Sequence, residues 1–246
     1  VGWAVGSPAP LDGVDAVVHA AAHRPAAYAD PGAAAACLTV NAVGTSALVE
    51  QAAAAGVRRF VYLSAGNVYR PLGRPAQEDD PIWPSHRAPY YLGSKICGEF
   101  FVSAATEAGR IAAVSLRPSA IYGPGMPAGL VSTLVGRLRA GQGVTLADGG
   151  RYEADLVAVD DVVDAIVAAL ARPVSGAVNV GSGTTVTAAV LARTVAALVG
   201  ADPASITIEP ERGDPPGFVA LDVRRAQAEL GITPRSLAVG LQRMVT

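Results

Sequence analysis

The sequence feature that most constrains the fold is a regular alternation of short β-branched runs with longer helical segments. The runs, which we predict to be strands, cover residues 14–20, 58–64, 111–117 and 177–181. The predicted helices cover residues 33–55, 91–108, 131–140, 160–173 and 186–199. Strands that alternate with helices in this way form a parallel sheet with helices on both faces. We therefore predict an α/β fold whose ligand site lies outside the carboxyl ends of the strands.

Side-chain patterns predict which helix faces are buried. In the segment 160–173, Asp160 or Asp161 is expected to cap the helix. The apolar residues expected to face the core are Ile96, Phe100 and Phe101 in the earlier helix and Val163, Ile166, Val167 and Leu170 in the later one. A Pro-rich loop with a Glu78-Asp79-Asp80 run is expected between residues 70 and 89.

Length and composition limit the class of protein. With 246 residues the chain is long enough for one large domain with a sizeable core. It has no run of about 18 uncharged apolar residues and no secretory signal, and its net charge of −2 gives no reason to expect nucleic acid. Cys37 and Cys97 lack metal-ligand spacing and are expected to be reduced thiols. We expect a cytoplasmic protein without a membrane, nucleic-acid or metal partner.

The first candidate for catalysis is the pair Tyr91 and Lys95, which lie one turn apart on the same helix face. An ammonium near a phenol stabilises the phenolate and lowers a pKa that starts near about 10. The result is a general acid/base that works near neutral pH. Lys95 is the only lysine among 19 basic residues, and a guanidinium does not replace its compact ammonium. The alternative is a surface helix on which Tyr and Lys happen to be four residues apart.

Further candidate residues lie where the predicted strands end. Ala20, Ala21 and Ala22 follow the first strand with no bulk, which allows a ligand to approach the backbone; tight loop packing is the alternative. Ser64 ends the second strand, and Pro118 with Ser119 follows the third. We expect these segments to meet at one cleft with Tyr91 and Lys95. His19, at the end of the first strand, is expected to be a core histidine.

Taken together, these segments resemble the extended short-chain dehydrogenase/reductase family, of the NAD-dependent epimerase/dehydratase type. The matching pieces are residues 15–22, 41–45, 62–64, 68–69, 91–95 with Glu99, 116–118, 122–125, 159–162 and 179–183. The resemblance implies a Rossmann-like doubly wound parallel sheet, formed by residues 1–125 and 156–181. It implies a small C-terminal α/β substrate domain, formed by residues 126–155 and 182–246.

The resemblance also implies a reaction. Tyr91 would exchange a proton with a substrate hydroxyl or carbonyl while a hydride passes between substrate and the nicotinamide of NAD or NADP. Lys95 would lower the pKa of Tyr91 and hold the nicotinamide ribose, and Ser64 is the third implied catalytic residue. Asn41 is expected to brace the backbone. The implied cofactor-binding residues are Ala20, Ala21, Ala22, Ser64, Tyr91, Lys95, Pro118 and Ser119, and the implied substrate-binding residues are Asn67, Tyr122, Arg151 and Arg212.

Two departures from the family pattern concern the cofactor and the assembly. The glycine-rich turn that receives the cofactor pyrophosphate is absent, because Gly2, Gly6 and Gly13 have the wrong spacing. We therefore expect an N-terminally truncated sequence that lacks the opening βαβ unit, with a natural protein lacking the dinucleotide site as the alternative. The resemblance implies a homodimer through the helices near 42–55 and 91–108.

Further departures concern the substrate. Ala65 stands where the family has Ser or Thr, and the Ser64 hydroxyl is expected on the other side of the strand. Gly66 and Asn67 replace the acidic pair of the dehydratases, which disfavours dehydration. Ala154 and Ala158 replace the Arg and His of nucleotide-sugar enzymes, so Arg212 and a substituting Arg151 are the remaining phosphate ligands.

We therefore predict an epimerase or reductase acting on a hydroxylated, sugar-like small molecule, with a nucleotide sugar as one form of it. The alternative is a non-redox relative on the same scaffold, either a binding or regulatory protein or a cofactor-free catalyst.

Overall fold

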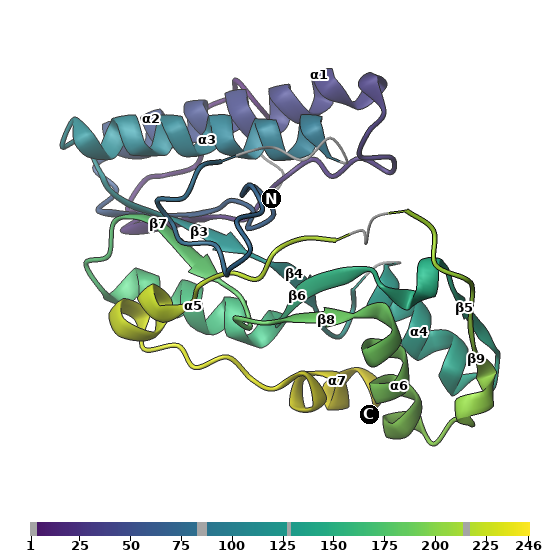
Figure 1. The fold of residues 1–246 in the computed structure, drawn as a ribbon. Helices are drawn as coiled ribbons and strands as arrows, with labels where there is room; N and C mark the ends of the chain where they lie inside the picture. Colours follow the sequence, from purple (N-terminus) through teal and green to yellow (C-terminus); the bar gives the residue numbers. More distant parts are fainter. Residues whose placement is uncertain (1–3, 83–87, 127–128, 214–216) are drawn as a thin grey trace.

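Four parallel strands form the main sheet, in the order β1-β2-β3-β7 (Figure 1). The computed structural model describes residues 4–82, 88–126, 129–213 and 217–246. The strands are β1 (Ala16–His19), β2 (Arg59–Leu63), β3 (Ala112–Pro118) and β7 (Gly176–Val180). They agree with the four predicted strands to within two residues at each end. Because all four run in parallel, their carboxyl ends meet at one edge of the sheet.

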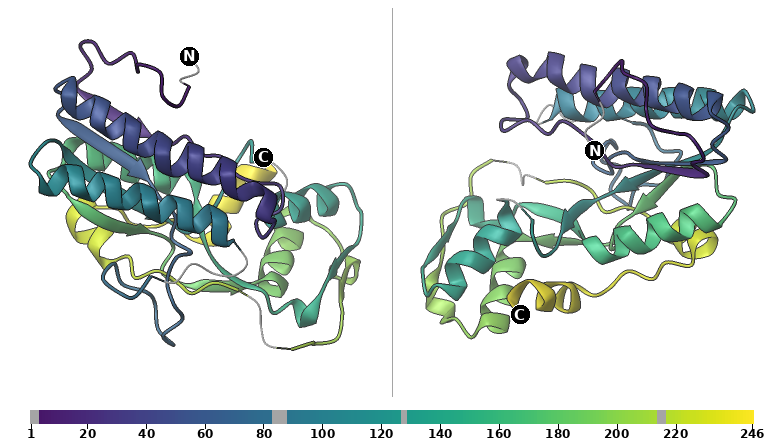
Figure 2. Two further views of the ribbon diagram at one scale, coloured as in Figure 1. Left: turned by 90° about the horizontal axis from the view of Figure 1, so that it is seen from above. Right: turned by 180° about the vertical axis from the view of Figure 1, so that it is seen from behind.

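Helices cover both faces of this sheet (Figures 1 and 2). One face carries α3 (Pro89–Glu107) and a nearly continuous run made of η1 (Pro31–Ala33), α1 (Ala34–Cys37), the π-helical η2 (Leu38–Val43) and α2 (Gly44–Ala54). The other face carries α5 (Val159–Ala171) and η5 (Ala226–Leu230). Alternate residues of β2 serve the two cores: Phe60 and Tyr62 pack with α2 and α3, and Val61 packs with α5. Burial on both faces is typical of a parallel sheet.

A second, smaller α/β region continues from the main sheet. Its strands are β4 (Ala120–Tyr122), β6 (Glu153–Ala158) and β8 (Thr185–Thr187) in one sheet and β5 (Val144–Leu146) with β9 (Ile206–Ile208) in another. Its helices are α4 (Leu130–Arg139), α6 (Ala188–Val199) and α7 (Leu237–Val245), with the short turns η3 (Asp148–Gly150) and η4 (Pro203–Ser205). These elements enclose their own core, which includes Leu134, Leu191 and Leu241. The sequence analysis did not predict α7.

The two regions are joined through β6. The boundary predicted between residues 155 and 156 falls inside this strand, which pairs with β4 and β8 and not with the main sheet. The chain then returns to the main sheet through α5. The division into a cofactor domain and a substrate domain stays a prediction.

The buried face of α5 differs from the prediction. Val163 and Val167 are 50% and 60% exposed, whereas Ala165 and Ala169 are fully buried. The small alanine side chains lie toward the sheet, which allows the helix to approach it closely. Neither predicted aspartate caps the helix, because the capping position is Ala158. Asp160 and Asp161 instead form ion pairs with Arg243 and Arg235.

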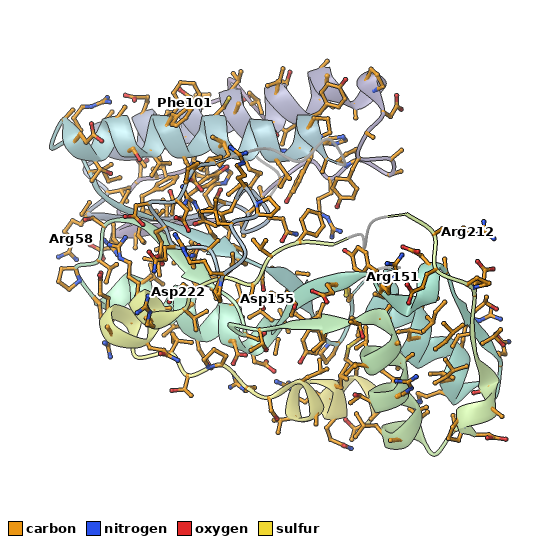
Figure 3. The ribbon with its side chains drawn as sticks, viewed as in Figure 1. Arg58, Phe101, Arg151, Asp155, Arg212 and Asp222 are labelled. Atoms are coloured by element: carbon orange, nitrogen blue, oxygen red, sulfur yellow. The ribbon has the colours of Figure 1, made fainter. Side chains whose placement is uncertain are left out.

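The outer surface of α3 also differs from the prediction. Phe100 is 64% exposed and Phe101 is 40% exposed, on the helical layer shown in Figure 3. The buried face of α3 is partly polar instead, with Ser94, Lys95 and Glu99 directed inward. A hydrophobicity pattern cannot detect a face whose buried members are ionisable.

The helical run Pro31–Ala54 was not anticipated as a long apolar segment. Among the described residues, it is the one helix whose length and composition would allow it to cross a membrane. Asn41 and Thr45 interrupt its apolar sequence, and both are fully buried. This run packs on α3. Because a core helix can have such a length and composition, these two properties alone are weak evidence for a membrane span.

The predicted loop at residues 70–89 is tied to the C-terminal part of the chain. The amide of Ala76 donates to Ala220 O (2.8 Å), and the amide of Asp222 donates to Ala76 O (2.7 Å). Residues 83–87 of this loop lie outside the described residues. The pairing brings the segment around Leu221, which is fully buried, against the end of β2.

Candidate active site

A cleft of about 800 Å³ lies at the carboxyl ends of the main-sheet strands. Its size is typical of sites for small molecules and cofactors. The predicted site residues that line it are Ala20, Ala22, Ser64, Asn67, Tyr91, Lys95, Pro118, Ser119 and Tyr122. The structure therefore brings together segments that are up to about a hundred residues apart, as parallel-strand topology requires. Ala21 is exposed and does not line the cleft.

Several lining residues had no sequence signal. Arg24 and Tyr28 come from the loop after β1, whereas Tyr152 and Phe218 come from the second region. A loop residue acquires a role only through its tertiary position, which neither periodicity nor spacing reveals.

The helix that carries Tyr91 and Lys95 begins next to the cleft. Pro89 occupies the first turn of α3, where its missing N–H costs no hydrogen bond. Ser94 Oγ donates to the carbonyl oxygen of Tyr91 (2.8 Å) and accepts from Asn41 Nδ2 (3.0 Å). Asn41 Oδ1 in turn accepts from the amide of His23 (2.7 Å). Asn41 therefore ties α3 to the loop after β1, which confirms its expected bracing role.

Lys95 is almost completely buried, with 2% of its surface exposed. Its Nζ lies 4.4 Å from the centroid of the Tyr62 ring, in a cation–π arrangement. Burial lowers the pKa of Lys95 to about 8, with the charge of Glu99 acting in the opposite direction. The ammonium is therefore mostly protonated at neutral pH but is easily deprotonated at moderately alkaline pH.

The pKa of Tyr91 moves in the direction opposite to the prediction. Burial raises it to about 12, and the neighbouring Tyr28 adds to the rise. Arg24 acts in the opposite direction, and Lys95 is not among the groups that shift this pKa. The expected lowering by Lys95 is therefore not met, because removal of the phenol from water outweighs nearby positive charge.

Ser64 lines the cleft as a residue, but its hydroxyl oxygen is buried. Strand β2 ends at Leu63, so strand alternation no longer fixes the direction of the next side chain. Ser64 lines the cleft together with Ala65. Its Oγ is buried and has no hydrogen-bond partner among the described residues. Buried hydroxyls normally have partners, and an oxygen with almost no accessible surface does not face the open cleft.

The two predicted phosphate-binding arginines do not line the cleft. Arg151 pairs with Asp148 (2.6 Å) and donates to the carbonyl oxygen of Gly213 (2.9 Å). Arg212 is exposed, and Figure 3 shows it at the outer edge of the second region. Its amide donates to Asp148 Oδ1 (2.5 Å). Arg151 thus stabilises the segment that carries Arg212 rather than contacting the cleft.

Tyr122 lines the cleft with its ring but directs its hydroxyl elsewhere. The hydroxyl donates to the carbonyl oxygen of Leu237 (3.4 Å), at the start of α7. Gly240 lies so close to this oxygen that a Cβ there would be 2.0 Å from it. The expected substrate hydrogen bond from Tyr122 is therefore replaced by a contact that holds α7 in place.

His19 is a core histidine, as predicted. Its ring stacks on Tyr62 at 5.4 Å, and its Nε2 lies 2.8 Å from Thr45 Oγ1. Thr45 Oγ1 already donates to the carbonyl oxygen of Asn41 (2.6 Å), so His19 Nε2 carries the proton. Burial, together with the charge of Lys95, lowers the pKa of His19 to about 4, so the ring is neutral.

Two buried polar groups hold the walls of the cleft. Arg117 forms an ion pair with Glu99 (2.6 Å), which joins β3 to α3, and it donates to Tyr69 Oη (2.6 Å). Asp155, labelled in Figure 3, accepts from the amide of Ser182 (2.7 Å) and from Ser119 Oγ (3.2 Å). The sequence analysis matched Arg117 and Glu99 to motifs but predicted none of these contacts.

The described residues contain no group of three or more His, Cys, Asp or Glu side chains placed to hold a metal ion. Cys37 and Cys97 are both free.

Comparison with known proteins gives a consistent result. Residues 9–181 match the model of the NAD dependent epimerase/dehydratase family. The chain is 36% identical over 216 residues to a UDP-glucose 4-epimerase of Mycolicibacterium smegmatis, and this match covers 84% of the chain and 67% of that protein.

Solved structures give the same result. The UDP-glucose 4-epimerase of Thermotoga maritima, solved with UDP-glucose, has a TM-score of 0.80 and 29% identity, over 94% of this chain and 76% of that one. MoeE5 in complex with UDP-glucuronic acid and NAD has a TM-score of 0.81 and 29% identity, and the match covers 95% of this chain and 78% of that one. MoeE5 has also been solved in complex with UDP-glucose and NAD, with the same TM-score and identity.

Proposed function

The chain belongs to the NAD-dependent epimerase/dehydratase family, and on that premise we propose that it oxidises and re-reduces a hydroxyl-bearing carbon of a nucleotide sugar. Tyr91 serves as the acid/base of this reaction. The observation that supports the proposal most strongly is that Tyr91, Lys95 and Ser64 line one cleft. UDP-glucose or UDP-glucuronic acid is bound in the similar structures.

The described residues fit the nicotinamide end of the cofactor. Ala20 and Ala22 have methyl side chains and leave room for a flat ring at the end of β1. Lys95 supplies a polar group in the same cleft, and the buried Ser64 Oγ lacks a partner among the described residues. At the pyrophosphate end, residues 4–15 form turns without a helix. The fit therefore extends to the ribose and nicotinamide.

When bound, NAD supplies the hydride acceptor and donor. The chain contributes the proton transfer and the orientation of the substrate. Tyr91 holds its proton at neutral pH, because burial raises its pKa to about 12. As a phenol it donates this proton to the substrate oxygen in the re-reduction step. In the oxidation step it accepts the hydroxyl proton as the phenolate, which the positive charge of Arg24 stabilises.

Epimerisation or reduction is favoured over dehydration by the space around Gly66. A Cβ at this residue would lie 2.6 Å from Leu221 Cδ1 and 2.8 Å from the carbonyl oxygen of Pro118. An acidic side chain, as the dehydratases carry here, does not fit without displacing backbone. The chain therefore lacks space for the acid that would remove the second proton of a dehydration.

We also propose a homodimer formed through the layer of α1, η2, α2 and α3. Four large apolar residues on this layer are exposed: Leu38, Val43, Phe100 and Phe101, by 48%, 55%, 64% and 40%. A cytoplasmic location, in which the two free cysteines stay reduced, belongs to the same proposal.

The redox proposal is tested by product analysis. The protein is freed of nicotinamide and incubated with UDP-glucose, with and without added NAD. A 4-epimer that forms only with NAD supports the proposal. Product formed equally without NAD identifies the cofactor-free catalyst considered above, and binding without product identifies the binding relative.

A further inference from the structure

The cleft is lined by two cationic side chains, Lys95 and Arg24. No Asp or Glu side chain is among its described lining residues. Lys95 lies deep in the site over the ring of Tyr62. Arg24 lies at the end of β1, where the mechanism assigns it no contact with a ligand. A cleft with this lining favours an anionic ligand.

Arg24 is held in place by aromatic side chains rather than by a carboxylate. Its Nε donates to Tyr28 Oη (3.0 Å). The ring of Tyr28 meets the ring of Tyr91 edge-on, with 5.4 Å between the centroids. Within the described part of the chain, the two terminal nitrogens of Arg24 have no hydrogen-bond partner. The guanidinium is thus oriented beside the reacting tyrosine with two donors available.

We propose that Arg24 binds a carboxylate of the substrate beside Tyr91, so that the site is specific for an acidic nucleotide sugar. The inference rests on the proposed function, since it specifies the substrate of the same cleft. Two parallel N–H donors of a guanidinium match the two oxygens of a carboxylate. Tyr28 acts as the positioning residue, because its hydroxyl fixes the direction of the guanidinium.

The position of Arg24 favours a group on the sugar over a phosphate. Arg24 bonds Tyr28, whose ring contacts that of Tyr91, and the charge of Arg24 acts on the Tyr91 phenol. The guanidinium is therefore on the Tyr91 side of the cleft, where the reacting carbon must lie. The pyrophosphate of a nucleotide sugar is separated from the reacting carbon by the sugar ring. Tyr152 and Phe218 of the second region also line the cleft.

The test compares two ligands that differ in one group, UDP-glucose and UDP-glucuronic acid, by calorimetry in the presence of NAD. Both carry the same pyrophosphate, and one carries a carboxylate. The unsubstituted protein is expected to bind the acid roughly 10-fold or more tightly, from the energy of a charge-assisted hydrogen bond. Arg24→Gln should remove this preference, and Arg24→Lys should retain part of it. Tyr28→Phe should reduce the preference.

Three outcomes overturn the inference. The unsubstituted protein could show no preference for the acid. Arg24→Gln could weaken the binding of both ligands equally, which would indicate that Arg24 binds the pyrophosphate that they share. Arg24→Gln could also leave the preference intact. Because these results compare the affinities of two ligands, they are distinct from failure of the proposed function, which would appear as turnover unaffected by Tyr91→Phe.

Discussion

Tyr91 and Lys95 lie one turn apart on α3, and burial shifts the pKa of each so that its neutral form is favoured. Removal from water raises the pKa of the phenol to about 12 and lowers that of the ammonium to about 8. The free site therefore holds a protonated tyrosine and a lysine that loses its proton readily. An anionic ligand in the cleft would stabilise the ammonium and raise its pKa again.

The buried ammonium has a measurable effect on stability. Below a pH of about 8, Lys95 is charged in both the folded and the unfolded chain, and its burial costs up to about 3 kcal/mol. Between pH 8 and 10.5 the unfolded chain still binds the proton and the folded chain does not, so stability rises with pH. Lys95→Met should therefore be the more stable protein at pH 7, and its advantage should shrink as the pH rises.

The measurement is the free energy of unfolding in denaturant at several pH values from 7 to about 10.5, the unperturbed pKa of lysine. Arg58→Met is the control, because Arg58 is exposed and paired at the surface with Asp15. The difference in free energy of unfolding between Arg58→Met and the unsubstituted protein should stay constant over this pH range. A constant difference for Lys95→Met as well would show that Lys95 is not buried as described.

At the scale of elements, α3 is fixed to the sheet by a buried ion pair. Arg117 on β3 and Glu99 on α3 are each 5% exposed, and two nitrogens of the guanidinium donate to the carboxylate. Removing one partner leaves the other charge buried without compensation. The geometry of the cleft therefore depends on this pair, although neither residue lines it.

Glu99→Gln should destabilise the protein by about 3–5 kcal/mol, because Arg117 stays charged and buried. Glu107→Gln, at the exposed end of the same helix, should change stability by less than about 0.5 kcal/mol. The double variant Glu99→Met/Arg117→Leu should recover much of the loss. Thermal unfolding of the three variants checks this. Equal losses of stability in Glu99→Gln and Glu107→Gln would argue against a buried ion pair.

At the scale of the whole molecule, the exposed apolar residues of the α2–α3 layer carry the dimer prediction. Phe100→Asp places a charge in the proposed interface and should convert the dimer into a monomer. Val167→Asp, on the opposite face at α5, is the matched control, since Val167 is 60% exposed. Sedimentation velocity distinguishes the two species. Dissociation by Val167→Asp but not by Phe100→Asp would place the interface on the other face.

The parts of the fold that were predictable are those set by local sequence. The strands were found because β-branched runs ending in small residues, such as Ala16–His19, are typical of buried parallel strands. The position of the cleft could be predicted from these strands, because parallel topology brings their carboxyl ends together. The buried faces of α3 and α5 were only partly right: Ile96 is buried as predicted, but Glu99 and Ala165 face inward where Phe100 and Val167 had been expected.

The parts of the site that were not predictable depend on contacts between distant segments. The partner of Arg117 and the loop position of Arg24 follow from tertiary packing alone. Arg151 was assigned to substrate because its local partner, Asp148, gives no signal in the sequence.

The central claim is that Tyr91 transfers the proton while a hydride passes to NAD. The most direct test is a single turnover with NAD and a nucleotide sugar, in which the absorbance of reduced nicotinamide is followed. Tyr90→Phe, one residue away and outside the cleft lining, serves as the control. The account predicts that reduced nicotinamide forms in the unsubstituted protein and in Tyr90→Phe but not in Tyr91→Phe. Formation at an unchanged rate in Tyr91→Phe would contradict it.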